Sequence, residues 1–318
     1  MSSLLRRSAG TGGASSGSED LTVTVLGDAD RPALTRLVGQ DPFVNAVLAA
    51  RLDALSSLSP RRFGGTLLGV RDPGGRLVAA AFHGGNLLPV AGDSDCTDEF
   101  GTAGVPDARD SCAEAWAVLG RYLARETRVC SSIVGRASAV SALWDELAPS
   151  WGRPRAIRDR QPLLALHDAA TLPPGDETVR RVQPAQLDAY VPAAAEMFTE
   201  ELGVSPYQCA AAGDYRRRVA SLVREGRAFA VFDRDGRVAF KADLGAVSRQ
   251  TCQVQGVWVR PELRGRGLGT RALAGVLAHA LTTAPTVSLY VNDFNVAARR
   301  MYARLGMVPA ATLSTVLF

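Results

Sequence analysis

The chain has 318 residues, of which 47% are hydrophobic and 21% charged, and its formal net charge is +4. This composition is that of a folded globular protein long enough for two domains, and it excludes a disordered or fibrous chain. No stretch approaches the roughly 18 consecutive apolar residues of a membrane helix, and the first residues lack the apolar run of a signal peptide. We therefore expect a cytoplasmic protein with no membrane partner.

The cysteines and histidines indicate neither a disulfide framework nor a metal site. The five cysteines are odd in number and none stands in a C-x-x-C pair, and the three histidines, His83, His167 and His279, lie far apart in the sequence. Zinc ligands in proteins normally come in closely spaced pairs. We expect no metal.

The charge is distributed unevenly between the two halves of the chain. Residues 1–177 carry 18 Arg against 21 acidic residues, whereas residues 178–318 carry 18 basic residues against 11 acidic ones. A basic half suits either nucleic acid or a small anionic ligand. Because the basic residues are dispersed and not interleaved with aromatic residues, we favour the small anion and expect no nucleic-acid partner.

The first half begins with a Gly- and Ser-rich tail, residues 1–18, which is too poor in apolar residues to fold and is predicted to be disordered. Apolar runs on either side of a turn at 72–76 predict antiparallel strands, and helices and strands alternate after them. The expected elements are strands 66–70, 77–83 and 86–90, a loop at 91–111, helix 112–125, strand 130–134, helix 137–147 and strand 162–166.

A segment containing Pro173, Pro174 and Gly175 is predicted to be the linker, residues 169–177, between domains at 19–168 and 178–318. The second half repeats the order of the first. Its expected elements are helix 187–199, strands 228–232, 238–247 and 254–259, helix 268–282, strand 287–291, helix 295–305 and strand 312–318. This repetition indicates an internal duplication.

The glycine loop after strand 254–259 is the most informative segment. Pro261 ends the strand, Arg264-Gly-Arg-Gly-Leu-Gly269 follows, and a helix with an apolar face begins directly afterwards. Glycines let a ligand approach the backbone, and a helix N-terminus carries about half a positive charge, so this arrangement suits a phosphate. Glycines are also common where a turn merely starts a helix. A dinucleotide-binding unit fits poorly, because the loop follows an antiparallel meander.

The loop resembles that of the GCN5-related N-acetyltransferase (GNAT) family, which reads Arg/Gln-x-x-Gly-x-Gly/Ala and is matched by Arg264, Gly267 and Gly269. The closer likeness is to actinobacterial tandem acetyltransferases whose first half is a degenerate copy of the second. The resemblance implies a mixed α/β (α+β) fold of two tandem GNAT-like domains. Each would have a central, mostly antiparallel twisted sheet flanked by helices.

A second family signature follows in the family's order. It is a strand followed by Asn, a small residue, Tyr and Leu-Gly-Phe, and it is matched by 289–295, Ala298, Tyr302 and 305–307. Together the two signatures cover most of 178–318.

The resemblance implies that the cofactor is acetyl-CoA or another short acyl-CoA. It would lie where strand 254–259 splays from strand 287–291, with the pantetheine arm against the first strand and the pyrophosphate in the loop. The residues expected to bind it are Val257, Trp258, Val259, Arg264, Gly265, Arg266, Gly267, Leu268, Gly269, Thr270, Asn292 and Asn295.

Tyr302 stands where family members place the general acid. Asn295, Ala298 and Tyr302 share one helix face by their spacing, and a phenol can protonate the departing thiolate. The competing interpretation is an ordinary core aromatic residue. A base is harder to assign, because the strand before the loop carries Gln253 and Gln255, and Gln cannot accept a proton.

Glu201 is the catalytic base that we favour, with Glu200, Asp243 or a water chain as alternatives. Each of these acids is also typical of a solvated surface charge.

The first half departs from the family pattern. Residues 93–110 hold six acidic residues against one Arg, which would repel phosphates. We interpret the first half as a scaffold that has lost catalytic activity.

The function expected from the sequence is transfer of an acyl group, most simply acetyl, from acyl-CoA to a primary amine by direct attack in a ternary complex. The acceptor would be a small molecule or a peptide, and the sequence leaves its identity and the oligomeric state open. Two alternatives remain: a non-catalytic acyl-CoA sensor, and an aminoacyl-tRNA-dependent transferase. The second would need a basic RNA-binding surface, for which the acidic first half offers no sign.

Overall fold

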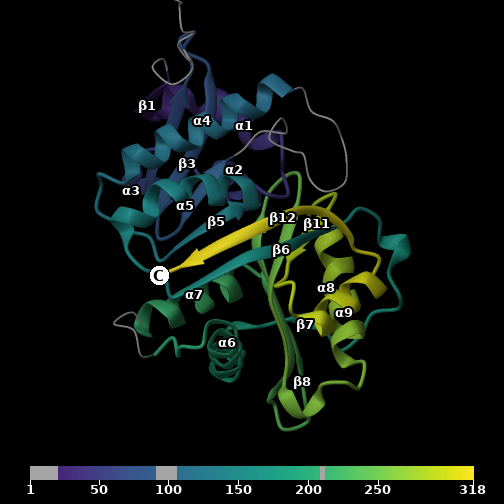
Figure 1. Cartoon of the computed structure of the whole chain (residues 1–318). Helices are drawn as coiled ribbons and strands as arrows, with labels where there is room; N and C mark the ends of the chain where they lie inside the picture. Colours follow the sequence, from purple (N-terminus) through teal and green to yellow (C-terminus); the bar gives the residue numbers. More distant parts are fainter. Residues whose placement is uncertain (1–20, 91–105, 208–211) are drawn as a thin grey trace, which may run out of the picture.

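The computed structural model describes residues 21–90, 106–207 and 212–318, so the predicted tail at 1–18 and most of the loop predicted at 91–111 lie outside the described residues. Within these ranges the strands form one 12-stranded sheet in the order β1-β2-β3-β4-β5-β12-β6-β11-β10-β9-β8-β7, flanked by helices (Figure 1). The predicted mixed α/β class is confirmed. No helix in the described ranges is long and apolar enough to cross a bilayer.

Both halves run from a short first strand to a long last one. The first contains β1 (Thr22–Val25), α1 (Arg31–Gly39), α2 (Ala46–Ala54), α3 (Pro60–Phe63), β2 (Gly65–Arg71), β3 (Leu77–Gly84), β4 (Leu87–Val90), α4 (Pro106–Leu123), β5 (Ser132–Arg136), α5 (Ala137–Trp151) and β6 (Ala156–Leu166). The second contains β7 (Arg180–Arg181), α6 (Leu187–Leu202), α7 (Ala212–Arg224), β8 (Ala228–Phe232), β9 (Val238–Val247), β10 (Cys252–Val259), α8 (Leu268–Leu281), β11 (Val287–Tyr290), α9 (Val296–Arg304) and β12 (Val308–Leu317).

The last strand of each half lies in the other half's part of the sheet. β6 pairs antiparallel with β11, and β12 pairs antiparallel with β5. The two exchanged strands also pair with each other. The sheet therefore has the same order from either edge, with β1-β2-β3-β4-β5-β12 matching β7-β8-β9-β10-β11-β6. This symmetry supports the internal duplication, and the halves predicted on either side of 169–177 are not separate sheets.

The predicted strands and helices of both halves are present. Helices α1, α2, α3 and α7 and strands β1 and β7 were not predicted. α4 begins at Pro106, inside the loop predicted at 91–111. β6 also differs, because it begins at Ala156 although the sequence predicted only 162–166. Its first part contains Arg158, Asp159 and Arg160, so it lacks the apolar run that marks a strand. It extends because β12 pairs with it as far as Ala156.

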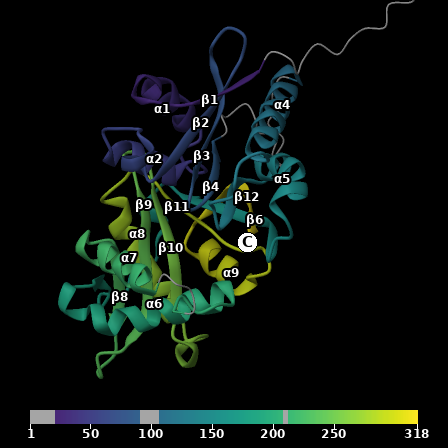
Figure 2. The ribbon, with the colours of Figure 1, turned by 90° about the vertical axis from the view of Figure 1, so that its left-hand side faces the viewer.

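Helices of the second half pack on opposite faces of its strands (Figures 1 and 2). α8 contributes Leu273, Val276 and Leu277 to a buried core with β10 and β11, and α9 adds Tyr302. A separate core on the other face contains Tyr190 of α6. The space between β10 and β11 is thus flanked by helices of both layers.

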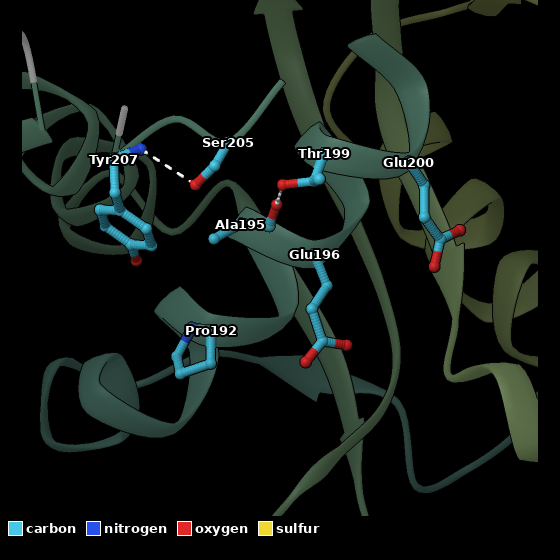
Figure 3. Close-up of a pocket in the computed structure, with 7 residues that line it drawn as sticks. All are labelled: Pro192, Ala195, Glu196, Thr199, Glu200, Ser205 and Tyr207. Carbon is cyan, nitrogen blue, oxygen red and sulfur yellow. Dashed lines mark hydrogen bonds between the residues drawn. The ribbon is translucent and has the colours of Figure 1, made fainter. Parts of the chain in front are cut away.

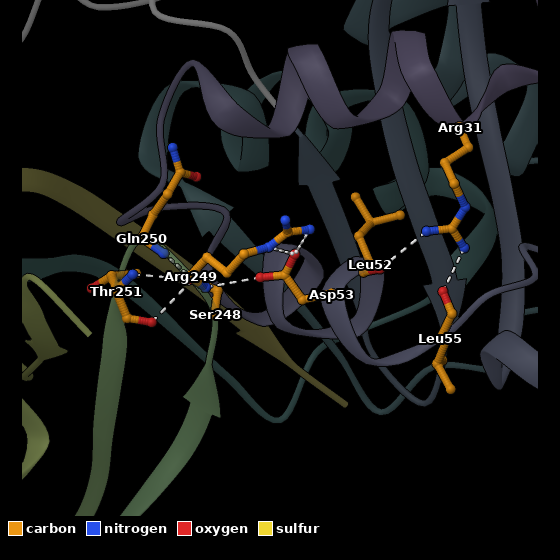
Figure 4. Close-up of polar contacts among 8 residues, drawn as sticks. All are labelled: Arg31, Leu52, Asp53, Leu55, Ser248, Arg249, Gln250 and Thr251. Carbon is orange, nitrogen blue, oxygen red and sulfur yellow. Dashed lines mark hydrogen bonds and ion pairs between the residues drawn. The ribbon is translucent and has the colours of Figure 1, made fainter. Parts of the chain in front are cut away.

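Polar contacts also tie the two halves together. Arg249, in the turn between β9 and β10, donates hydrogen bonds to the Asp53 carboxylate of α2 from its backbone N–H at 2.8 Å and its Nε at 3.0 Å (Figure 4). Arg31 of α1 stabilises the same end of α2, because its guanidinium donates to the carbonyl oxygens of Leu52 and Leu55 at 3.0 and 2.6 Å. These carbonyls lie at the C-terminus of α2, where the helix leaves them without internal partners.

Candidate active site

β10 and β11 begin side by side and then diverge. Within the described ranges they pair only at Cys252 with Val287 and at Gln253 with Ser288. On its other edge β10 stays paired with β9, although a bulge around Gly256 interrupts the register. The gap predicted between these strands is therefore present, and it leaves the later part of β10 without a partner on the β11 side.

The glycine loop leads from β10 into the first turn of α8. Gly265 and Gly267 have φ angles of +74° and +78°, a left-handed conformation that favours glycine. In the described part of the chain, no backbone N–H group of residues 265–270 donates a hydrogen bond. The loop is exposed. Free N–H groups at the positive end of a helix form a binding site for an anion.

Gly269 lets α8 approach the strands closely. A Cβ atom at this position would lie 3.1 Å from Val259 Cγ2 and 3.3 Å from Met301 Sδ. Leu268 and Thr270, its neighbours in the first turn of α8, are half-buried. A larger side chain at Gly269 would push this turn away from β10 and α9.

Arg264 of the loop is engaged in the structure. Its Nε donates to the carbonyl of Val259 at 2.8 Å, and its guanidinium contacts both carboxylate oxygens of Glu200 at 3.0 and 2.7 Å. Arg266 and Arg271 form no ion pair within the described ranges. The charge of Arg266 is therefore available to an anion at the loop, whereas Arg271 also interacts electrostatically with Asp176.

Tyr302 is buried in the core that α8 and α9 form against β10 and β11, with 6% of its surface exposed. Its hydroxyl has no hydrogen-bond partner among the described residues. Burial, and then the negative charge of Glu201, raises the pKa of Tyr302 well above its usual value near 10. The phenol therefore keeps its proton at neutral pH, which is the form a proton donor requires.

Glu201 lies at the C-terminal end of α6 and acts electrostatically on Tyr302, so the structure brings the two predicted catalytic residues near each other. Its side chain is 47% exposed, and Arg158 of β6 lies 3.8 Å from its carboxylate. Arg158 also donates to the backbone carbonyl of Glu201 at 2.5 Å. The exchanged strand β6 thus anchors the end of α6 that carries Glu201.

Asn292 and Asn295 lie between β11 and α9, and each side chain already has a structural partner. Asn295 caps α9 by accepting a hydrogen bond from the N–H of Ala298 at 3.1 Å. Asn292 accepts one from Gln161 of β6 at 2.9 Å. The side-chain oxygens of both residues are therefore engaged, and their side-chain NH2 groups are the parts that can donate to a ligand.

Val257, Trp258 and Val259 form the last part of β10, beside the gap. The Trp258 side chain is buried, with 5% of its surface exposed, and its Nε1 donates to Glu200 at 3.2 Å. It therefore belongs to the core under α6, and only its backbone can face a ligand. Val257 and Val259 are half-buried.

Asp243 was expected to be a solvated charge, and this expectation is wrong. It is 5% exposed, and its carboxylate accepts hydrogen bonds from Tyr190 at 2.6 Å and from Lys241 at 2.7 Å. Both oxygens are engaged, so Asp243 is unsuited to act as a base. The sequence places Lys241 on the same strand face as Asp243, but it assigned no role to Lys241 and did not indicate the contact with Tyr190. The available signal was that Lys241 is the single lysine of the chain and stands inside an apolar strand.

Two cavities are found near these elements. One, of about 560 Å³, runs along the outer face of α6 and is lined by Pro192, Ala195, Glu196, Thr199, Glu200, Ser205 and Tyr207 (Figure 3). In the figure Tyr207 and Glu200 lie at opposite ends of it. The second, of about 450 Å³, lies between β6, α9 and β12, and its lining includes Arg160, Arg299 and Arg300. Tyr302 lines neither cavity.

In the first half the corresponding strands, β4 and β5, lie close together. β4 and β5 pair in parallel only at Leu87 with Ile133 within the described ranges, as β10 and β11 do at their start. The ring of Pro89 then packs against Gly135, where a Cβ atom would lie 2.7 Å from Pro89 Cγ. The acidic segment 93–110, predicted to repel phosphates, lies largely outside the described residues. In those residues no cluster of three or more His, Cys, Asp or Glu side chains could hold a metal.

Comparison with known families assigns the two parts of the chain separately. Residues 195–307 match the model of the acetyltransferase (GNAT) family, and residues 65–190 match a domain of unknown function, DUF4081. No curated protein matches the chain significantly.

Solved structures resemble the chain along nearly its whole length. A tandem GNAT protein from the clavulanic acid biosynthesis pathway is 17% identical with a TM-score of 0.53, and the match covers 94% of this chain and 98% of that one. A GNAT acetyltransferase from Colwellia psychrerythraea is 14% identical with a TM-score of 0.54, covering 93% and 99%. A protein from Drosophila is 15% identical with a TM-score of 0.62, covering 93% and 98%. The chain therefore carries a domain of the acetyltransferase (GNAT) family in residues 195–307, built on the fold of tandem GNAT proteins.

Proposed function

We propose that the protein transfers an acetyl group from acetyl-CoA to a primary amine by direct attack in a ternary complex. The observation that carries this proposal is the gap between β10 and β11, followed along the chain by the loop 265–270 with its free N–H groups. Tyr302 belongs to the core that packs on the same strands. A thioester with a long, uncharged arm suits the open edge of β10, and a pyrophosphate suits the loop.

The residues present suit this cofactor. The N–H groups of Gly265, Arg266, Gly267, Leu268, Gly269 and Thr270 would hold the pyrophosphate, helped by the side-chain charges of Arg266 and Arg271. The backbone of Val257, Trp258 and Val259 would pair with the pantetheine arm in place of a strand. The amide groups of Asn292 and Asn295 would donate to the same arm. No metal is needed in this arrangement.

Acetyl-CoA supplies an activated acyl carbon, which the amine attacks, and a thiolate that leaves. Tyr302 would give its phenolic proton to the departing sulfur, and Glu201 would take the proton that the amine loses. Backbone N–H groups of β10 would stabilise the negative charge on the acyl oxygen. The proton on Glu201 returns to Tyr302 through solvent before the next turnover, so the protein is unchanged.

The acceptor would be an amine on a small molecule or peptide that is protonated in solution and gives one proton to solvent before it attacks the acyl carbon. Glu196 places a carboxylate on the cavity along α6, whereas the Glu200 carboxylate in the same lining is already paired with Arg264. Carboxylates favour a protonated amine and disfavour a nucleic acid. We propose that the protein works in the cytoplasm without a membrane or nucleic-acid partner.

Release of free thiol from acetyl-CoA in the presence of pooled primary amines tests the proposal. We expect release that depends on the amine pool, together with a mass increase of one acetyl group on the acceptor. A protein that binds acetyl-CoA but releases no thiol with any amine would be a sensor and would refute the proposal. Release from aminoacyl-tRNA but not from acetyl-CoA would refute it equally.

A further inference from the structure

A buried polar cluster lies between β9 and α6, directly beneath the bulge of β10. Lys241 and Tyr190 have none of their surface exposed and Asp243 has 5%. Lys241 Nζ donates to Asp243 Oδ2 at 2.7 Å, and Tyr190 donates to Asp243 Oδ1 at 2.6 Å. The Lys241 amine also lies 5.5 Å from the centre of the Tyr190 ring. The charges are thus paired and hydrogen-bonded, as burial requires.

Such a cluster is a costly way to fill a core. Removing two charges from water costs free energy that their attraction does not always recover, and apolar residues of similar volume often serve as well. The surrounding core of α6, β8 and β9 is apolar, with Val191, Ala194 and Val238 among its members. Lys241 has one further hydrogen bond, to the backbone of β10, and this bond indicates a role for the cluster.

That contact is with the bulge itself. Lys241 Nζ donates to the backbone carbonyl of Gly256 at 3.0 Å. Gly256 has a φ of +60°, and a Cβ atom there would lie 2.8 Å from Lys241 Nζ and 3.1 Å from Met197 Cε. The bulge therefore requires glycine for both its conformation and its space, and the lysine holds its carbonyl in place.

The direction of this carbonyl determines the direction of the next N–H group. A trans peptide is planar, so its C=O and N–H point opposite ways. β9 and β11 flank β10 on its two sides. Arg260 N–H donates to Ala239 of β9, and Trp258 pairs with Lys241 two residues earlier in the same register, so the backbone groups of Trp258 face β9. In an extended strand the N–H groups of neighbouring residues point to opposite sides, so the Val257 N–H faces the gap, in keeping with a Gly256 carbonyl held by Lys241. A cation on the carbonyl also polarises the peptide and strengthens its N–H as a donor.

We propose that Lys241 is a positioning residue for acyl transfer: through the Gly256 carbonyl it aims the Val257 N–H at the acyl oxygen in the gap between β10 and β11. This inference rests on the proposed function. Lys241 does not touch the reacting atoms. Asp243 and Tyr190 hold the lysine side chain in place, which accounts for a buried ion pair at this point of the sheet.

The double variant Lys241→Met/Asp243→Asn tests the inference without leaving a buried charge unpaired. Tyr190 can still donate to the introduced amide oxygen. We expect the variant to bind CoA with unchanged affinity and to lose roughly 10²–10³-fold in kcat, the loss typical of one oxyanion donor, with little change in KM for acetyl-CoA. A matched control, Arg136→Met/Asp41→Asn, removes a buried ion pair of the first half and should leave kcat unchanged.

A spectroscopic measurement separates positioning from a merely structural role. The carbonyl stretch of acetyl-CoA labelled with ¹³C at the thioester carbonyl should fall on binding to the native protein and to the control. In the double variant it should return toward the solution value. A variant that binds acetyl-CoA with the native carbonyl frequency and the native kcat overturns the inference but leaves the proposed function standing. Native protein that binds no acetyl-CoA overturns both.

The native chain permits a second test that does not depend on the variant folding. Because the chain contains a single lysine, labelling with ¹⁵N-lysine gives one side-chain amine signal in NMR. We expect this Lys241 signal to shift when acetyl-CoA binds and to shift less when CoA binds, because only acetyl-CoA carries the acyl oxygen. Equal responses to the two ligands, or none, would overturn the inference.

Discussion

At the scale of the residue, Tyr302 packs in the core with α8 and β10, and we propose that its hydroxyl protonates the departing thiolate. The change Tyr302→Phe removes one hydroxyl, which has no partner among the described residues, and leaves the ring. We expect turnover to fall roughly 10²–10⁴-fold, in kcat and kcat/KM together, because the interaction belongs to the transition state. Acetyl-CoA affinity by calorimetry should stay the same. Native turnover in the Phe variant, under conditions where chemistry limits the rate, would exclude Tyr302.

Buried tyrosines also predict how stability depends on pH. Burial raises the pKa of both Tyr190 and Tyr302 above the value near 10 that tyrosine has in an unfolded chain. Above about pH 10 the unfolded state therefore loses protons that the folded state keeps. The stability that the two protonated tyrosines contribute to the folded state is fully present below that pH. It is lost as the pH rises toward the pKa values that they have in the folded protein. Urea midpoints measured across this range should fall, and Tyr190→Phe should make the fall shallower. An unchanged slope in the variant would contradict the assignment.

At the scale of the element, the loop leading into α8 is predicted to hold the pyrophosphate. The change Gly267→Asp places a negative charge at the helix N-terminus, so we expect CoA binding to be abolished while the fold persists. Gly236→Asp is a matched control, because Gly236 has a similar φ of +75°, against +78° for Gly267, and lies in the turn between β8 and β9 with open space around it. Calorimetry should show native affinity in the control. Native affinity in a folded Gly267→Asp variant would mean that the phosphates bind elsewhere.

At the scale of the whole molecule, one site per chain is expected. β10 and β11 diverge after their first two pairs, whereas Pro89 of β4 packs closely against Gly135 of β5 in the first half. Calorimetry should therefore give one CoA per chain, and two equal sites would contradict the degenerate first half. The exchange of β6 and β12 adds a second expectation. Residues 169–318 alone lack the strand that pairs with β11, so they should fold and bind CoA only when residues 21–168 are supplied, as followed by circular dichroism.

Much of the fold and of the candidate site could be predicted from local patterns, because these depend on residues that are close together in the sequence. The order of strands and helices follows from apolar periodicity and turns, and the loop from Arg264 to Gly269 follows from glycines between a strand and a helix. Contacts between distant segments leave no such mark. Asp243 looks like a surface charge in the sequence, because nothing near it shows that Tyr190 will lie against it.

The sequence by itself determined the class of fold, the duplication and the loop that suits a phosphate, since each depends on residues within a few turns or strands of one another. Only the tertiary structure decided that the halves exchange their last strands, that the Trp258 side chain belongs to the core, and that the single lysine supports the bulge at Gly256. The physical reason is that these outcomes depend on which segments share a sheet edge or a core. Such pairings are selected by burial and hydrogen bonding summed over the whole chain.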